Sequence, residues 1–247
     1  MLGSLISGCT GDHSTRDTTP TAYEPPENVR NATMIWSAES GIDLVGPEAI
    51  LVRAAREADV VARYAGPDST YPGFMDALDP ELHDFYGYES GVAAIYGTQY
   101  ARLQSLDVSP DGFTALICIQ GDGMARLSEG TYVSSNGPAY ALMYEFVDRT
   151  LTPPERAVAY APSSIPDTSD EPTATDRPGD QPAWSAPRNN LFTGWTITLR
   201  PLSDETNELC DPWGRTLFPD APPEPETVEN SSPPPTLPAS PGWLGDS

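Results

Sequence analysis

The chain has 247 residues, and its charged side chains are strongly unbalanced. All 13 of its basic residues are arginine, against 36 acidic residues, which gives a formal net charge of −23. Nucleic acids and anionic membrane surfaces attract basic patches, so this composition argues against both as direct partners. Proline, with 28 residues, is about twice as frequent as in ordinary proteins and clusters outside the apolar segments. We therefore expect only part of the chain to fold.

The residues Leu5-Ile6-Ser7-Gly8-Cys9 resemble the site cut by the bacterial lipoprotein signal peptidase. The resemblance implies that Cys9 is lipidated and anchors the protein to the outer face of the cell membrane. Only eight residues precede Cys9 and none is basic, whereas a signal peptide needs about 15–30 residues. Either the true N-terminus lies upstream of this shortened signal (residues 1–9), or the chain has been shortened at Met1, or the match is accidental. Residues 10–32 are rich in Thr, Pro, Asp and Glu, which predicts a disordered tether. Residues 31–36 then predict a short strand or a packed lead-in.

The clearest secondary-structure signal is a helix over residues 47–65. Gly46-Pro47 supplies a stop and the proline that favours the first helical turn, and Gly66-Pro67 ends the helix. Arg53–Glu57 and Asp59–Arg63 are spaced i to i+4, so we expect ion pairs on a solvent-exposed face. Apolar residues at three- and four-residue spacing predict the core-facing stripe: Leu51, Ala54, Ala55, Ala58, Val61, Ala62 and Ala65.

The middle of the chain changes from helical to strand-like patterns. Residues 68–90 predict a turn, a short helix and a loop, with Tyr71 and Phe74 as aromatic anchors. Residues 93–148 predict an antiparallel meander with a hairpin turn at 109–112 and a break at 121–123. Its later strands are expected at 125–133 and 139–147.

Two further Pro-rich segments flank the last predicted strand, at residues 194–199. Residues 151–190 predict a mobile surface insertion, and residues 219–247 predict a disordered acidic tail. The remaining chain predicts a single α+β domain over residues 33–218. In it, one amphipathic helix packs on a curved antiparallel sheet of four to five strands.

Three blocks of this domain look like those of secreted or lipid-anchored proteins of mycobacteria and related actinobacteria. The blocks are Arg53-Ala-Ala-Arg-Glu-Ala58 with Trp36 before it, Tyr71-Pro-Gly-Phe74, and Gly194-Trp-Thr-Ile-Thr-Leu199 followed by Cys210. The order of elements also resembles the NTF2-like cone, in which helices pack into a strongly bent antiparallel sheet. Folds of that kind host isomerases, dehydratases and binding modules, so the resemblance leaves the function open.

Beyond Cys9 the chain has two cysteines, an even number that suits an oxidising compartment. Cys118 lies inside a predicted strand, and Cys210 follows the last one. Adjoining strands could bring the two together, so we expect a disulfide; the alternative is a pair of buried free thiols.

His83 is the only histidine outside the predicted tether, and carboxylates and tyrosines surround it in sequence. Asp76, His83, Asp84 and Tyr86 could provide the acid–base groups of an NTF2-like isomerase. The alternative is a polar surface loop whose tyrosines pack inward. No calcium-loop, zinc, phosphate-loop or nucleophile-elbow pattern is present, so we predict neither a metal nor a cofactor.

These observations favour a lipid-anchored protein of the cell envelope that acts as a non-enzymatic binding or accessory module. Its partner would be another protein or a small apolar ligand, besides the membrane reached through Cys9. The alternative is an isomerase or dehydratase that uses the Asp/His/Tyr cluster around His83.

Overall fold

The computed structural model describes residues 23–87, 93–151, 186–187, 189–202 and 204–243. In chain order, its elements are β1 (Asn31–Ala38), α1 (Pro47–Ala65), η1 (Pro67–Ser69), α2 (Phe74–Ala77), η2 (Pro80–Leu82), α3 (His83–Gly87), β2 (Ile95–Ser109), β3 (Gly112–Gln120), β4 (Met124–Ser128), β5 (Thr131–Asn136), β6 (Tyr140–Asp148), β7 (Trp195–Pro201), α5 (Asp204–Asn207), α6 (Asp211–Leu217) and β8 (Glu226–Asn230). The predicted α+β class is confirmed.

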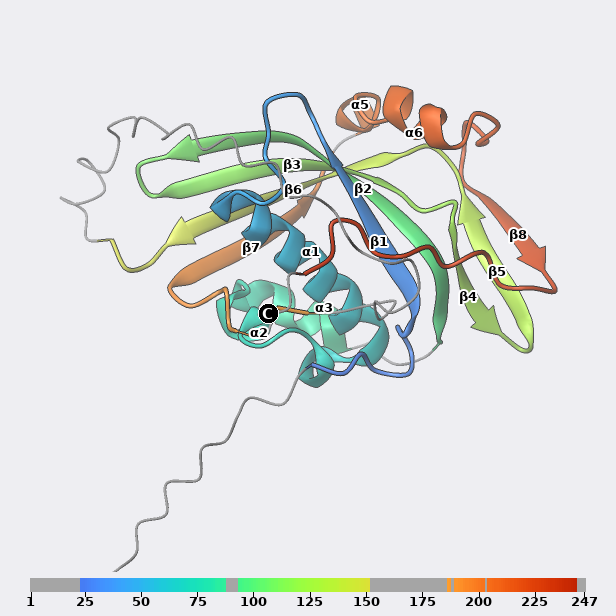
Figure 1. The fold of residues 1–247 in the computed structure, drawn as a ribbon, viewed down its shortest axis with the longest axis horizontal. Coiled ribbons are helices and arrows are strands. Elements are labelled where there is room, and N and C mark those ends of the chain that lie inside the picture. Colours follow the sequence, from blue (N-terminus) through green and yellow to red (C-terminus); the bar gives the residue numbers. More distant parts are fainter. Residues whose placement is uncertain (1–22, 88–92, 152–185, 188, 203, 244–247) are drawn as a thin grey trace, which may run out of the picture.

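The strands form one curved, mostly antiparallel sheet with β2 near its centre (Figure 1). β2 pairs antiparallel with β3 and, at its start, with β4, while β1 runs parallel along its other edge. β3 and β4 pair in turn with β6 and β5. β7 and β8 extend the sheet beyond β6 and β5. Helices α1, α2 and α3 cover one face of this sheet, and α5 and α6 lie on the opposite face.

With eight strands, the sheet is larger than the four to five strands predicted. The hairpin turn at 109–112 is confirmed, because Ser109 pairs with Gly112 at the start of the β2–β3 ladder. The single strand predicted over 125–133 is wrong. Glu129 and Gly130 both take positive φ angles, of 50° and 85°, and the chain reverses there into two strands, β4 and β5.

Helix α1 begins and ends where the sequence predicts, but most of the face expected to be exposed to solvent is buried. Every residue from Leu51 to Ala62 is buried, including Arg53, Glu57 and Asp59, whereas Arg63 is partly exposed. The residues after the helix cover one side, where the Thr70 hydroxyl donates to the Ala58 carbonyl. The C-terminal segment covers another, where Arg53 donates to the Pro241 carbonyl. The i to i+4 pattern fits an exposed and a buried helix equally well, which explains the wrong prediction.

The disorder predicted for residues 219–247 is wrong for residues 219–243, which the structure describes. β8 pairs with β5, and the chain then runs along β1. Trp36 donates its backbone N–H to the Ser240 carbonyl, and the Leu237 carbonyl accepts from the Thr33 hydroxyl. A proline-rich chain is already extended, so it can lie beside an edge strand and satisfy its free backbone groups. Residues 244–247 lie outside the described part.

The predicted tether and insertion lie mainly outside the described residues, as do the signal residues 1–9. Where the end of the tether is described, it is packed rather than free: Val29 is fully buried, and Tyr23 contacts Tyr71 edge to face. Of the insertion predicted over 151–190, residues 152–185 and 188 lie outside the described part.

A buried carboxylate, Glu57, holds the C-terminal segment against α1. Three side chains from distant parts of the chain donate hydrogen bonds to it: the Trp36 indole (3.0 Å), the Tyr71 hydroxyl (2.8 Å) and the Trp243 indole (2.6 Å). Arg53 lies over the Trp243 ring, 4.7 Å from its centroid. Burial raises the pKa of Glu57 above its ordinary value, against the opposing effect of Arg53 and of the three hydrogen bonds.

The disulfide between Cys118 and Cys210 is confirmed, with 5.3 Å between the Cα atoms. It lies on the face of the sheet opposite α1, in a small apolar cluster with Ala139 and Ala141 against which Trp213 of α6 packs. The bond therefore ties the α5–α6 region to the centre of the sheet.

The raised pKa of Glu57 predicts a specific pH dependence. A group whose pKa is higher in the folded than in the unfolded state stabilises the fold below its unfolded pKa and loses that effect as the pH rises through the folded value. Relative to a Glu57→Gln variant, the wild type should therefore lose unfolding free energy as the pH rises from about 4.5 upward. Urea unfolding of both proteins across this range measures the difference.

Glu39→Gln is the matched control, because the Arg102 guanidinium lowers the pKa of the exposed Glu39 carboxyl. Relative to that variant, the wild type should lose stability as the pH falls below about 4.5 and should show no slope above it. If Glu57→Gln gave a slope of the same sign as Glu39→Gln, the assigned effect of burial on Glu57 would be wrong.

Candidate functional site

A cavity of about 830 Å³ lies between the C-terminal half of α1 and the strands β4, β5 and β6. Its size falls within the range of sites that hold small organic ligands, roughly 300–1,000 Å³. Much of its wall is apolar, with side chains from the helices and from the sheet: Val60, Leu82, Phe85, Ile95, Met124, Val133, Leu142 and Leu199. Phe85 and Tyr140 are more than a third exposed, so this wall reaches the protein surface.

Behind the part of the cavity that α1 lines (the helical wall), one carboxylate forms ion pairs with two arginines. Asp59 is fully buried and accepts from Arg56 and, at 2.8 Å, from Arg63. The Tyr86 hydroxyl donates to the same carboxylate at 2.8 Å, and Arg56 also donates to the side-chain oxygen of Gln99. Burial, and then the charge of Asp59, raise the pKa of Tyr86, so this hydroxyl remains a donor. Both arginines line the cavity.

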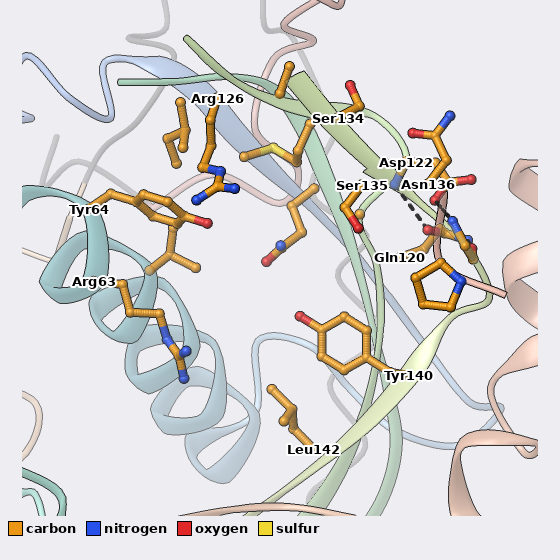
Figure 2. A pocket seen from close by; sticks show the side chains of 18 of the residues that line it. Arg63, Tyr64, Gln120, Asp122, Arg126, Ser134, Ser135, Asn136, Tyr140 and Leu142 are labelled. Atoms are coloured by element: carbon orange, nitrogen blue, oxygen red, sulfur yellow. Dashed lines mark hydrogen bonds between the residues drawn. The ribbon is translucent and has the colours of Figure 1, made fainter. Parts of the chain in front are cut away.

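The side chains of Arg63, Tyr64 and Arg126 lie on the same side of the cavity, and the Tyr140 hydroxyl points toward that side (Figure 2). Arg63 and Tyr64 come from α1, Arg126 from β4 and Tyr140 from β6. The guanidinium of Arg63 also lies 4.5 Å from the centroid of the Phe85 ring. Guanidinium and phenol groups are hydrogen-bond donors, so this side of the cavity can bind an acceptor or an anion.

The other side of the cavity carries a fixed set of polar groups at the junctions between β3 and β4 and between β5 and β6 (Figure 2). The Gly137 N–H donates to Asp122 at 2.8 Å, and Gln120 bonds the Asp122 N–H and the Gly137 carbonyl. Burial raises the pKa of Asp122, against the hydrogen bond from Gly137. The side-chain oxygen of Asn136 is buried with no partner among the described residues.

The proposed catalytic residues do not come together at this cavity. Asp76, His83 and Asp84 are exposed, and none of them lines it. The His83 ring nitrogen Nε2 lies 3.3 Å from the Leu78 carbonyl. Tyr86 is the one member of the predicted set at the cavity, and its hydroxyl is already bonded to Asp59.

Sequence reasoning missed the cavity arginines Arg56 and Arg126 and assigned Arg63 to the solvent. Arg56 and Arg63 flank Asp59 at i−3 and i+4 on α1, and this helical spacing of one acid and two arginines offered a signal. Arg126 gave no signal, because its place depends on the pairing of β4 with β2 and β5.

In the described parts of the chain, no group of three or more His, Cys, Asp or Glu side chains is placed to hold a metal ion. No helix among the described residues is long and apolar enough to cross a membrane. Comparisons with protein-family models, with curated proteins and with solved structures find no match to this chain. The resemblances to actinobacterial lipoproteins and to the NTF2-like cone therefore stay predictions.

The buried cluster around Asp59 predicts the effect of breaking it. Asp59→Asn leaves the charge of Arg56 buried without its carboxylate, which should lower the unfolding free energy by about 3–5 kcal/mol. Glu145→Gln is the control, because it removes the exposed pair with Arg200 and should cost less than about 1 kcal/mol. Equal losses in urea unfolding would contradict the structural role of Asp59.

Proposed function

We propose that this domain is a non-enzymatic binding module that holds a small, largely apolar ligand in the cavity beside α1. The observation that carries the proposal is the cavity itself: its volume suits a small organic molecule, and its wall is mostly apolar with a few fixed polar groups. The buried pairs of Asp59 hold the helical wall in place without a ligand, and a preformed wall reduces the entropy lost on binding.

The positions of the titratable groups favour binding over catalysis. Among the described residues that line the cavity there is no histidine or cysteine, and Asp122 is the single carboxylate. Its nearest fixed partner is a backbone N–H rather than a second acid or base. Acid–base chemistry on a substrate usually needs two positioned groups, and no observation here favours the isomerase alternative.

We also propose that the domain works outside the cytoplasm, anchored through a lipid on Cys9. The disulfide between Cys118 and Cys210 supports this location, because such bonds persist in oxidising compartments. Cys9 and the sequence around it lie outside the described residues, so the anchor rests on its resemblance to a lipoprotein cleavage site.

Ligand binding can be tested with N-phenyl-1-naphthylamine, an uncharged probe whose fluorescence rises in apolar surroundings. The wild type should bind one probe per chain. Ser135 lines the cavity from β5, so Ser135→Trp should fill part of the space and abolish or strongly weaken probe binding. Ser128→Trp is the control, because it adds the same side chain to exposed strand surface that does not line the cavity.

Both variants should keep the far-ultraviolet circular dichroism of the wild type. A probe that failed to bind, or that bound Ser135→Trp and Ser128→Trp equally well, would show that the cavity is not a binding site for apolar molecules.

The anchor has a separate test. Protein extracted from the membranes of its native host should have the mass of a chain that starts at Cys9 and carries a diacylglycerol group. Cys9→Ala should abolish this addition and release the protein from the membrane fraction. An unmodified Cys9 in the membrane-extracted protein would exclude lipid anchoring.

A further inference from the structure

We propose that the cavity selects an amphipathic organic anion, with an apolar body and a carboxylate or sulfonate head, and that Arg126 binds the head beside Arg63 and Arg56. The inference rests on the proposed function, because it names the class of ligand that the same cavity would hold. It goes further by assigning the charge of that ligand and the residue that recognises it.

The first observation is the position of an unpaired arginine. The chain has 13 basic residues against 36 acidic ones, so carboxylates are plentiful as partners for its arginines. Arg102, Arg200 and Arg215 each have one, whereas Arg30, Arg53, Arg126 and Arg149 have none among the described residues. Of these four, Arg126 alone lines the cavity; the residue is exposed to solvent, and its guanidinium points into the cavity (Figure 2). An unpaired cation beside an apolar wall is suited to an anion that the protein itself does not supply.

The second observation is independent of the first and concerns the buried cluster. Arg56 and Arg63 share the single carboxylate of Asp59, so the helical wall carries two positive charges against one negative charge. Arg56 is 3% exposed, and its Nε–H has no hydrogen-bond partner among the residues described. With Arg126, the arginine side of the cavity therefore has an excess of positive charge and an unused donor.

The walls restrict which anions fit. Val60, Leu142 and Leu199 line the same cavity and offer nothing to a hydrated phosphate, whereas an acyl or aromatic body would bury apolar surface there. A polyanion is disfavoured by the net charge of −23. The phenol groups of Tyr64 and Tyr140 lie near the arginines and can donate to the head of a small anion (Figure 2).

A pair of probes that differ by one charged group tests the inference. 1-Anilinonaphthalene-8-sulfonate has the framework of N-phenyl-1-naphthylamine with an added sulfonate, which stays ionised across the working pH range. The wild type should bind the sulfonate about tenfold more tightly than the neutral probe, since a hydrogen bond to a charged group is worth about that much. The preference should shrink as the salt concentration rises.

Arg126→Gln should weaken sulfonate binding by about tenfold and leave the neutral probe within about twofold of the wild type. Arg126→Lys should restore part of the preference, because it retains the charge without the planar fork. Arg30→Gln is the matched control: it changes the net charge equally at an exposed arginine that does not line the cavity, and it should leave both affinities unchanged.

The possible outcomes separate the two proposals. Suppose that Ser135→Trp blocks binding of the neutral probe, but the wild type binds the sulfonate no more tightly than the neutral probe. The anion preference is then wrong and the binding function stands. The same conclusion follows if Arg126→Gln lowers the affinity for both probes equally. If Ser135→Trp weakens the binding of neither probe, both proposals fail. A preference lost equally in Arg126→Gln and Arg30→Gln would show that only the overall charge matters, and would overturn the assignment of Arg126.

Discussion

The carboxylate of Glu57 is the group on which the arrangement of this domain depends. Its three donors belong to β1, to the turn after α1 and to the C-terminal segment, which are far apart in sequence. A buried carboxylate without such donors would cost several kcal/mol, so α1 can occupy the centre of the fold only when all three segments close over it. The hydrogen bonds thereby couple the position of the helix to the position of both ends of the described chain.

Asp59 repeats this arrangement on another side of the same helix. Two residues correspond to about 200° of rotation, so Glu57 and Asp59 point in nearly opposite directions. Glu57 binds the segments that close the core, whereas Asp59 binds the arginines that line the cavity. The two buried carboxylates of one helix therefore have different roles. Glu57 stabilises the closed core, and Asp59 positions the arginines of the cavity, although the sequence pattern placed both groups in solvent.

The sequence predicted those features that depend on neighbouring residues. Glycine and proline determined the ends of α1 and the hairpin after β2, and the even cysteine count predicted the disulfide. The predictions from sequence were wrong where the structure depends on contacts between segments that are distant in the chain. β8 is almost wholly exposed, so it lacks the alternation that marks a strand, and proline content predicts irregular structure without excluding tertiary contacts. Trp243 in a tail of proline and serine was the unused signal. The cavity depends on strand pairing, which no local pattern encodes.

The contact between Trp243 and Glu57 spans 186 positions in the sequence. During synthesis, the central helix therefore lacks one of its three hydrogen-bond donors until residue 243 has emerged. Contacts of such long range form late because the entropy of closing the loop must be overcome first. We expect nascent chains to remain loosely packed and open to proteases until that point. An incompletely packed chain is also one that can still be threaded through a narrow channel, as delivery across a membrane before folding would require.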